Sequence, residues 1–126
     1  MQTPSGAVEI ENLRVGDEVW GLDAAGKLNV NTVVATRFAT VDGYLRMTFT
    51  DGATLEVTDV HPISTPEGWR PAGVLRPGDV VRKRRGLATI ERIEKVSARA
   101  VVHDITVEPD ACFYAGGILV HNKSRE

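Results

Sequence analysis

The sequence predicts an all-β domain, and two observations carry that prediction. Apolar and polar residues alternate with a period of two between Leu45 and Val57, on both sides of the dipeptide Asp51-Gly52. An Asp-Gly pair between alternating segments is a strong short-range signal for a β-hairpin. No segment sustains a period of 3.6 residues, so we expect at most single helical turns, near Ile10–Leu13 and Ala72–Leu75.

Further strands are expected where β-branched residues are dense. Lys27–Val41 is rich in Val and Thr and should hold one or two strands, and Thr89–Val96 and Ala100–Val107 should each hold one. A second hairpin is predicted from Phe113 to Val120, where two short apolar runs flank Gly116-Gly117. These elements account for most of the chain without any α-helix.

A short internal repeat refines the architecture. Leu13-Arg14-Val15-Gly16-Asp17 recurs as Leu75-Arg76-Pro77-Gly78-Asp79, about half the chain later. Both copies follow an expected helical turn and precede an expected strand. We therefore predict a duplicated β-unit that closes on itself with pseudo-twofold symmetry.

Length and composition exclude several classes of function. The 126 residues favour one domain with its own core, and a formal charge of −2 argues against binding to nucleic acids or membrane surfaces. Cys112 is the only cysteine, so no internal disulfide can form and no cysteine-histidine spacing suits zinc. We expect neither metal nor cofactor. Cys112 is interpreted as a small buried strand residue, with a reactive thiol as the alternative.

The end of the chain carries the most informative polar residues. A Gly-Gly turn and three apolar residues lead directly into His121-Asn122, followed by Lys123. An asparagine can cut its own peptide bond: its side-chain nitrogen attacks its own carbonyl carbon, closes a succinimide and expels the next residue's amine. A neighbouring histidine can polarise that carbonyl or protonate the leaving amine. The alternative is a polar chain end, although the apolar run favours burial of the pair.

Four segments occur in an order that matches a known family. They are Leu13-Arg14-Val15-Gly16-Asp17, Thr58-Asp59-Val60-His61 followed by Pro62, Val102-His103-Asp104-Ile105-Thr106-Val107-Glu108, and the stretch from Phe113 to Asn122. Together they resemble the motifs of the Hint domain, the autoprocessing fold of inteins, hedgehog C-terminal domains and bacterial intein-like domains. The resemblance implies a pseudo-twofold, horseshoe-shaped β-domain that splices or cleaves itself in a single turnover.

The resemblance also implies roles for individual residues. Thr58 and His61 would grip an N-terminal scissile peptide, with the histidine donating to the departing amide nitrogen. Asn122 would be the nucleophile of C-terminal cleavage at the Asn122–Lys123 bond, His121 its acid and electrophile, and Asp104 a supporting residue that links the two steps. From the residues alone, Thr58 and His61 also fit a His-Pro turn, and Asp104 fits a surface charge.

His103 and the basic run Arg82–Arg85 have less specific readings. His103 occupies a position where the family usually has an aromatic residue, and we interpret it as packing at the edge of a sheet, with proton transfer as the alternative. Arg82–Arg85 is interpreted as a solvated loop between strands. The alternative is a nucleic-acid site, which the absence of interleaved aromatic residues disfavours.

Three departures from the family pattern bear on the expected activity. The family begins with a nucleophile and a short strand before a turn like Thr3-Pro4-Ser5-Gly6, so we expect that N-terminal strand to be missing and this chain alone to lack the N-terminal acyl shift. A histidine often found before the last hairpin is replaced by Ala111. Lys123 offers an ammonium, a poor acyl acceptor at neutral pH, where the family has Cys, Ser or Thr. We expect slow cleavage without ligation.

These considerations set the expected boundaries and partners. Residues 1–122 form the autoprocessing domain and residues 123–126 are flanking sequence. The partners are the flanking host segments, called exteins, and a short N-terminal peptide that would supply the missing strand and make this chain the larger part of a split pair. We expect a monomer. The alternatives are a catalytically silent β-domain that acts as a binding or structural module, or a β-barrel that binds nucleic acid through Arg82–Arg85.

Overall fold

The computed structural model describes residues 2–3, 6–7 and 10–122, and within them the chain is built almost entirely of strands. Two short 3-10 helices lie at Ile10–Asn12 and Ala72–Val74, at the two positions where the sequence predicts helical turns. The strands are β1 (Gln2–Thr3), β2 (Gly6–Ala7), β3 (Glu18–Leu22), β4 (Leu28–Val41), β5 (Tyr44–Phe49), β6 (Thr54–Val57), β7 (Pro62–Thr65), β8 (Gly68–Pro71), β9 (Val80–Arg82), β10 (Leu87–Val96), β11 (Ala100–Glu108), β12 (Cys112–Ala115) and β13 (Ile118–His121).

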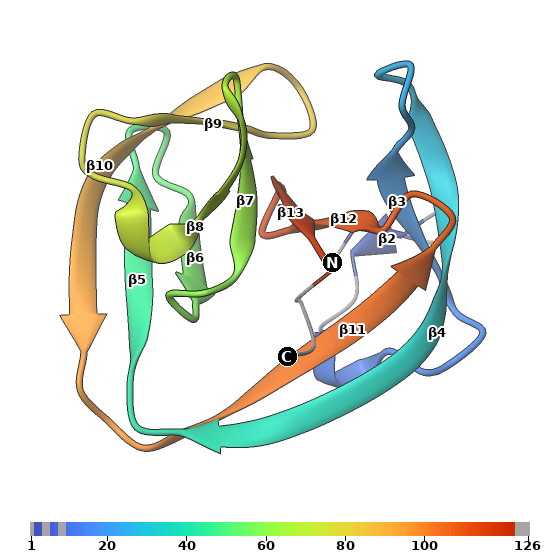
Figure 1. The fold of residues 1–126 in the computed structure, drawn as a ribbon, viewed down its shortest axis with the longest axis horizontal. Coiled ribbons are helices and arrows are strands. Elements are labelled where there is room, and N and C mark those ends of the chain that lie inside the picture. Colours follow the sequence, from blue (N-terminus) through green and yellow to red (C-terminus); the bar gives the residue numbers. More distant parts are fainter. Residues whose placement is uncertain (1, 4–5, 8–9, 123–126) are drawn as a thin grey trace.

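The strands form curled antiparallel sheets that surround a central hairpin. The sheet orders are β6-β5-β10-β9, β11-β4-β3 and β12-β13-β7-β8, and the short pair β1-β2 completes the described chain. Figure 1 shows β4 and β11 as one long curved side, β5 and β10 rising from its end, and β12 and β13 crossing the interior. The all-β prediction is confirmed. No helix in the described part of the chain is long and apolar enough to cross a membrane.

Two long antiparallel arms form the frame. One arm is β4 continuing into β5, and the other is β10 continuing into β11; β4 pairs with β11 from Thr32 opposite Glu108 to Val41 opposite Ala100. Where the arms bend, a side chain at Gly43 would bring its Cβ within 2.9 Å of the carbonyl oxygen of Val96. Glycine is therefore required for the close approach of the two backbones at this bend.

The two copies of the repeat fold into the same turn. The backbone N–H of Arg14 donates to the Asp17 carboxylate at 2.8 Å, and the N–H of Arg76 donates to the Asp79 carboxylate at 2.8 Å. In both copies a second hydrogen bond closes the turn, from the aspartate N–H to the arginine carbonyl at 3.0 Å. The aspartate in each copy thus fixes a turn that its short side chain can reach locally.

Each turn then attaches to a long arm in the same way. The N–H of Gly16 donates to the Val33 carbonyl in β4, and the N–H of Gly78 donates to the Ile90 carbonyl in β10. Both glycines have a positive φ, 97° and 96°, which a residue with a Cβ adopts only at a cost. The hydrogen bonds of the two turns and of their attachment to β4 and β10 correspond one to one, so the predicted duplication is confirmed.

The predicted hairpins are confirmed, together with the faces they bury. β5 and β6 pair around Asp51-Gly52, with Met47 opposite Leu55. The apolar residues of the alternating pattern are buried in the main core, namely Leu45, Met47, Phe49, Leu55 and Val57. Lys27–Val41, where one or two strands are expected, holds the single strand β4.

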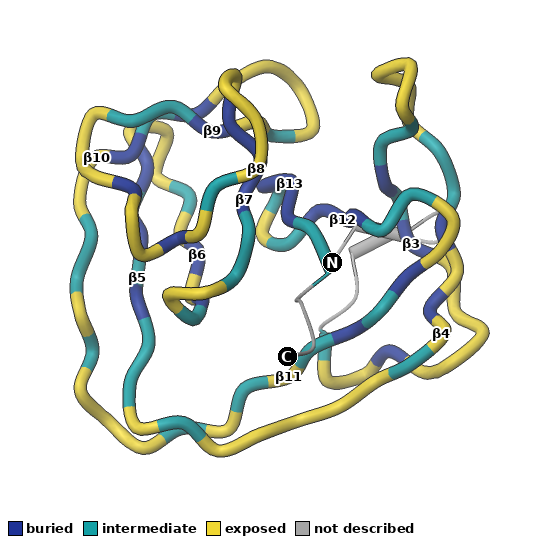
Figure 2. The backbone as a smooth tube through the Cα atoms, in the orientation of Figure 1, coloured by how far each residue is buried: buried dark blue, intermediate teal, exposed yellow. Residues whose placement is uncertain are grey.

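The β12–β13 hairpin is covered on both faces, as its dark blue trace in Figure 2 shows. One face lies in the main core through Phe113, Ile118 and Val120. The other face forms a second cluster of Cys112, Tyr114 and Leu119, against which Trp20 and Leu22 pack. A hairpin buried in this way holds its last residue, His121, and the residue that follows it, Asn122, in a fixed position.

Cys112 is a small buried strand residue, as predicted. It is 3% exposed, and its thiol donates to the carbonyl oxygen of Leu22 at 3.3 Å. Burial raises the pKa of the Cys112 thiol above its ordinary value, because the thiolate would be poorly solvated there. The thiol therefore serves packing.

At the front of the described chain, β1 and β2 pair with Thr3 opposite Gly6. Thr3 and Gly6, the first and last residues of the predicted turn, thus lie opposite each other, and Pro4 and Ser5 lie outside the described residues. β1 consists of Gln2 and the first residue of that turn, Thr3, and the expected absence of the family's N-terminal nucleophile and strand stays a prediction. Lys123 also lies outside the described residues.

Candidate functional site

Asn122 is held at the end of β13 by the loop that precedes β12. Cys112 pairs with His121 as the last register position of the hairpin. One residue further, the backbone N–H of Asn122 donates to the carbonyl oxygen of Ala111 at 2.8 Å. The burial of β12 and β13 thus fixes the backbone of Asn122 as well as that of the strand.

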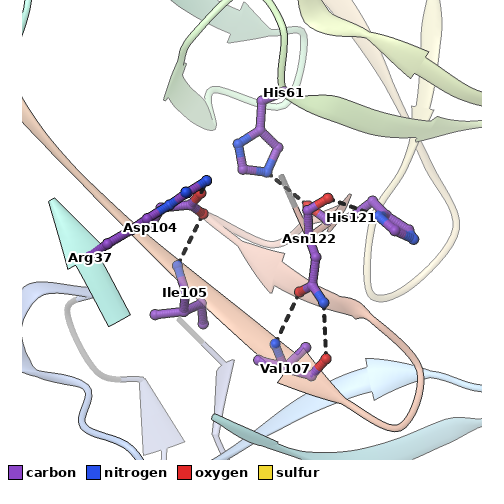
Figure 3. Close-up of polar contacts among 7 residues, drawn as sticks. All are labelled: Arg37, His61, Asp104, Ile105, Val107, His121 and Asn122. Atoms are coloured by element: carbon purple, nitrogen blue, oxygen red, sulfur yellow. Dashed lines mark hydrogen bonds and ion pairs between the residues drawn. The ribbon is translucent and has the colours of Figure 1, made fainter. Parts of the chain in front are cut away.

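The side chain of Asn122 pairs with the backbone of β11. Its Oδ1 accepts from the N–H of Val107 at 3.0 Å, and its Nδ2 donates to the carbonyl oxygen of Val107 at 2.9 Å. Figure 3 shows both bonds, which imitate one step of a β-ladder. The amide is therefore oriented, and Nδ2 must leave the Val107 carbonyl before it can attack another atom.

His121 lies against the carbonyl of Asn122. Its Nδ1 is 2.8 Å from that oxygen, and because a carbonyl oxygen only accepts, Nδ1 must carry the hydrogen. The ring of Trp69, from β8, packs against the imidazole at a centroid distance of 4.9 Å and an interplanar angle of 73°. The imidazole is thus placed to draw electron density from the Asn122 carbonyl.

His61 reaches the end of β13 from the segment between β6 and β7. Its Nε2 is 2.9 Å from the carbonyl oxygen of His121, so by the same reasoning Nε2 carries a hydrogen. The ring packs edge-on against Phe113, with centroids 6.4 Å apart. Two hydrogen bonds fix its backbone: the N–H of His61 donates to the Thr58 carbonyl at 3.2 Å, and the carbonyl of His61 accepts from the N–H of Ala72 at 3.0 Å. The Thr58–His61 segment is thereby joined to the chain end, as Figure 3 shows for His61 and His121.

Thr58, His61 and Asp104 line one open cleft of about 430 Å³. In Figure 3 the Asp104 side chain lies beside Arg37, away from Asn122. The Asp104 Oδ2 is 3.5 Å from the Arg37 guanidinium, and its Oδ1 accepts from the N–H of Ile105 at 3.0 Å. The structure therefore joins His61, His121 and Asn122 by hydrogen bonds, and brings Thr58 and Asp104 to the same cleft.

Comparison with solved structures gives the family of this domain. The gp41-1 intein is 31% identical over 96% of this chain and 91% of that chain, with a TM-score of 0.82. A bacterial intein-like domain from Clostridium thermocellum is 26% identical over 97% of this chain and 93% of that one, with a TM-score of 0.90. No family model matches the chain, and no curated protein matches it.

The chain belongs to the inteins and intein-like Hint domains. The Ssp DnaB mini-intein variant M86, at 20% identity and a TM-score of 0.91 over 100% of this chain and 91% of that one, has the same fold. The intein-like chain is thus a protein-splicing or autoprocessing domain, and such a domain is flanked by extein segments.

Two residues that contact His121 and Asn122 were not predicted from the sequence. Trp69 contacts His121, and its signal in the sequence was an aromatic residue directly after the polar turn Thr65-Pro66-Glu67-Gly68. Val107 contacts Asn122 through its backbone alone, so its side chain gave no signal.

His103 and the basic run lie where the sequence placed them. His103 is exposed on β11, an edge strand, and packs against Phe38 with ring centroids 6.1 Å apart. The basic run begins at Arg82, the last residue of β9, and continues into the loop before β10, where Lys83 pairs with Asp51 at 3.2 Å and Arg84 lies over the ring of Trp20. Within the described residues, no group of three or more histidine, cysteine or acidic side chains could hold a metal ion.

Proposed function

We propose that this intein-like domain cleaves its own chain after Asn122. In the proposed step, the Asn122 Nδ2 attacks the Asn122 carbonyl carbon and a new carbon–nitrogen bond closes a five-membered succinimide. The bond to the nitrogen of Lys123 breaks. Nδ2 gives up one proton, the Lys123 nitrogen gains one, and the products are a chain ending in a succinimide and a peptide with a free amine. No water or cofactor is consumed.

The 2.8 Å hydrogen bond from His121 to the Asn122 carbonyl is the observation that carries the proposal. Negative charge develops on that oxygen as the nitrogen attacks, and a hydrogen-bond donor already aimed at it stabilises the charge. The same imidazole can then pass a proton towards the leaving nitrogen. His121 therefore acts as both electrophile and acid.

His61 and the backbone of Ala111 hold the reacting residue on its N-terminal side. His61 donates to the carbonyl of the peptide group before Asn122, and Ala111 accepts from the Asn122 N–H. These two bonds restrain both ends of one peptide group. In the proposal they keep the Asn122 carbonyl beside His121 while the side chain leaves Val107 and rotates to attack.

The cleft beside this site is proposed to take the N-terminal scissile peptide. Thr58, His61 and Asp104 all line it. In this proposal Thr58 and His61 would hold that peptide, and Asp104 would link its cleavage to that of the Asn122–Lys123 bond. A short peptide supplied in trans could occupy the same cleft, with this chain acting as the larger part of a split pair. The proposed domain ends at Asn122, and residues 123–126 are flanking sequence.

Mass spectrometry of the purified chain during incubation tests the proposal. We expect release of the peptide Lys123–Glu126 and a product lighter by one water than the hydrolysis product, because a succinimide has formed. Replacing Asn122 by Ala should abolish release, since the nucleophile is gone. Release from that variant at the unaltered rate, or a product with a plain carboxylate from the outset, would refute the cyclisation.

A further inference from the structure

A cluster of three polar side chains lies on the far side of the loop that holds Asn122. Asp110 is in the turn between β11 and β12, and Asn29 and Asn31 are on β4. The Asp110 Oδ2 accepts from the Nδ2 of Asn29 and from the Nδ2 of Asn31, each at 2.8 Å. The backbone N–H of Asp110 donates in turn to the Asn31 Oδ1 at 2.7 Å. Both the side chain and the backbone of Asp110 are thus tied to β4.

The cluster is rigid because Asn31 has no freedom to move. Asn31 is fully buried, and a Cβ on the neighbouring Gly21 would come within 2.7 Å of its Nδ2. Glycine at that position makes room for the amide. Hydrogen bonds to a carboxylate are shorter and stronger than those between neutral groups. The pair Asn31–Asp110 is therefore a firm anchor between β4 and the loop.

The anchor is one residue away from the group that holds Asn122. Ala111 follows Asp110, has a φ of +60°, and uses its carbonyl oxygen to accept from the Asn122 N–H. A residue with a Cβ keeps a positive φ only where its surroundings impose it. Asp110 is hydrogen-bonded through both its side chain and its backbone, and it thereby restrains Ala111 to a positive φ from the N-terminal side.

We propose that Asn29, Asn31 and Asp110 form a positioning cluster for Asn122, which acts through the Ala111 carbonyl. The inference rests on the proposed cyclisation, because it gives the cluster the task of keeping the Asn122 carbonyl beside His121. None of the three touches the reacting atoms. They act by fixing the loop whose Ala111 carbonyl accepts the hydrogen bond from the Asn122 N–H.

The test compares three variants in two assays. Asp110→Ala removes the acceptor and leaves both asparagine amides without it. Asp110→Asn retains one oxygen that can accept from both. Asp79→Ala is the matched control, because Asp79 also fixes a turn by a backbone hydrogen bond but lies on the β9 side of the fold. The assays are the rate of Lys123–Glu126 release and hydrogen exchange at the Asn122 N–H, normalised to amides of β5.

We expect Asp110→Ala to speed exchange at the Asn122 N–H and to slow release, each by about tenfold, because small misplacements of reacting groups are costly. Asp110→Asn should stay within about twofold of the unaltered chain in both assays, since the hydrogen bonds can re-form. Equal effects from Asp110→Ala and Asp79→Ala would overturn the inference. So would faster exchange in Asp110→Ala with an unchanged rate of release.

The two proposals fail in distinguishable ways. If the unaltered chain releases no peptide, the proposed cleavage is wrong, and the exchange assay still decides whether the cluster holds Asn122. If the unaltered chain releases the peptide and Asp110→Ala does so equally fast, cleavage stands and the positioning role is wrong.

Discussion

Two histidines, His61 and His121, each donate a ring hydrogen bond to a backbone carbonyl at the end of β13. His61 donates Nε2–H to the carbonyl of His121 at 2.9 Å, and His121 donates Nδ1–H to the carbonyl of Asn122 at 2.8 Å. The two acceptors are consecutive carbonyls of one backbone. Only the second is the carbonyl that the Asn122 side chain would attack. The two imidazoles therefore differ in role because of the carbonyl each one meets.

The aromatic neighbours of the two histidines differ in burial. Phe113, which packs edge-on against His61, is 1% exposed and belongs to the main core. Trp69, which packs against His121, is 45% exposed. The ring of His61 therefore packs against a buried core side chain, and the ring of His121 packs against a partly exposed one. It follows that the setting of His121 can be altered without damaging the fold, whereas that of His61 cannot.

Replacing His121 should have the largest effect of the changes that probe this comparison. For His121→Ala we expect release to slow by about 10³-fold, because general acid catalysis and charge stabilisation at the Asn122 carbonyl are both lost. The rate is measured by mass spectrometry of the released peptide. His103→Ala is the control, because that exposed ring packs against Phe38, and it should stay within about twofold. Equal slowing by both variants would contradict a specific role for His121.

Replacing Phe113 should cost mainly stability. We expect Phe113→Ala to lower the free energy of unfolding by about 3–5 kcal/mol, because a buried ring leaves a cavity in the core. Urea denaturation followed by circular dichroism measures the change. A loss below about 1 kcal/mol would mean that the site tolerates a cavity, and the core would then not be what holds His61.

Replacing His61 should have a smaller effect on release than replacing His121. His61→Ala removes a donor to a carbonyl that is not attacked, so we expect release to slow by about tenfold, through loss of positioning. The measurement is the same release assay, run beside His121→Ala. If His61→Ala were as slow as His121→Ala, the two histidines would share one role and the comparison above would fail.

The sequence predicted those parts of the fold that depend on neighbouring residues. The Asp51-Gly52 and Gly116-Gly117 hairpins follow from local turn chemistry, and the two repeat turns follow from an aspartate that reaches a backbone N–H three residues away. The same holds for the burial of the β12–β13 hairpin, which a run of apolar residues indicates. Each of these signals lies within about ten residues of sequence.

The partners of the chain end could not be predicted in this way. The Asn122 side chain hydrogen-bonds to the backbone of Val107, and every residue type has the same backbone groups, so the sequence gives no signal for this contact. Asn31 and Asp110 meet because β4 pairs with β11, and that register depends on the whole frame. Asp104 lines the same cleft as Thr58 and His61, but its ion pair is with Arg37, directly across the β4–β11 ladder, a contact that follows from register alone.

Replacing Trp69 should have the smallest effect, and it tests directly whether the partly exposed indole holds the His121 ring. An aromatic pair contributes about 0.5–1.5 kcal/mol beyond the burial of its surface. Without the indole, the His121 ring should therefore face the Asn122 carbonyl for a smaller fraction of the time. We expect peptide release from Trp69→Leu to slow by about threefold. The free energy of unfolding should change by less than about 1 kcal/mol, because the side chain is half exposed.

Trp69→Phe is the matched variant, because it keeps a ring beside His121, and its rate should lie within about twofold of the unaltered chain. The nitrogen-15 shifts of His121 report the ring directly. In Trp69→Leu the Nδ1 signal should move away from that of a hydrogen-bonded N–H, and in Trp69→Phe it should stay. A slower Trp69→Leu chain with an unmoved Nδ1 signal would show that the indole acts on release by another route, and that His121 is held without it.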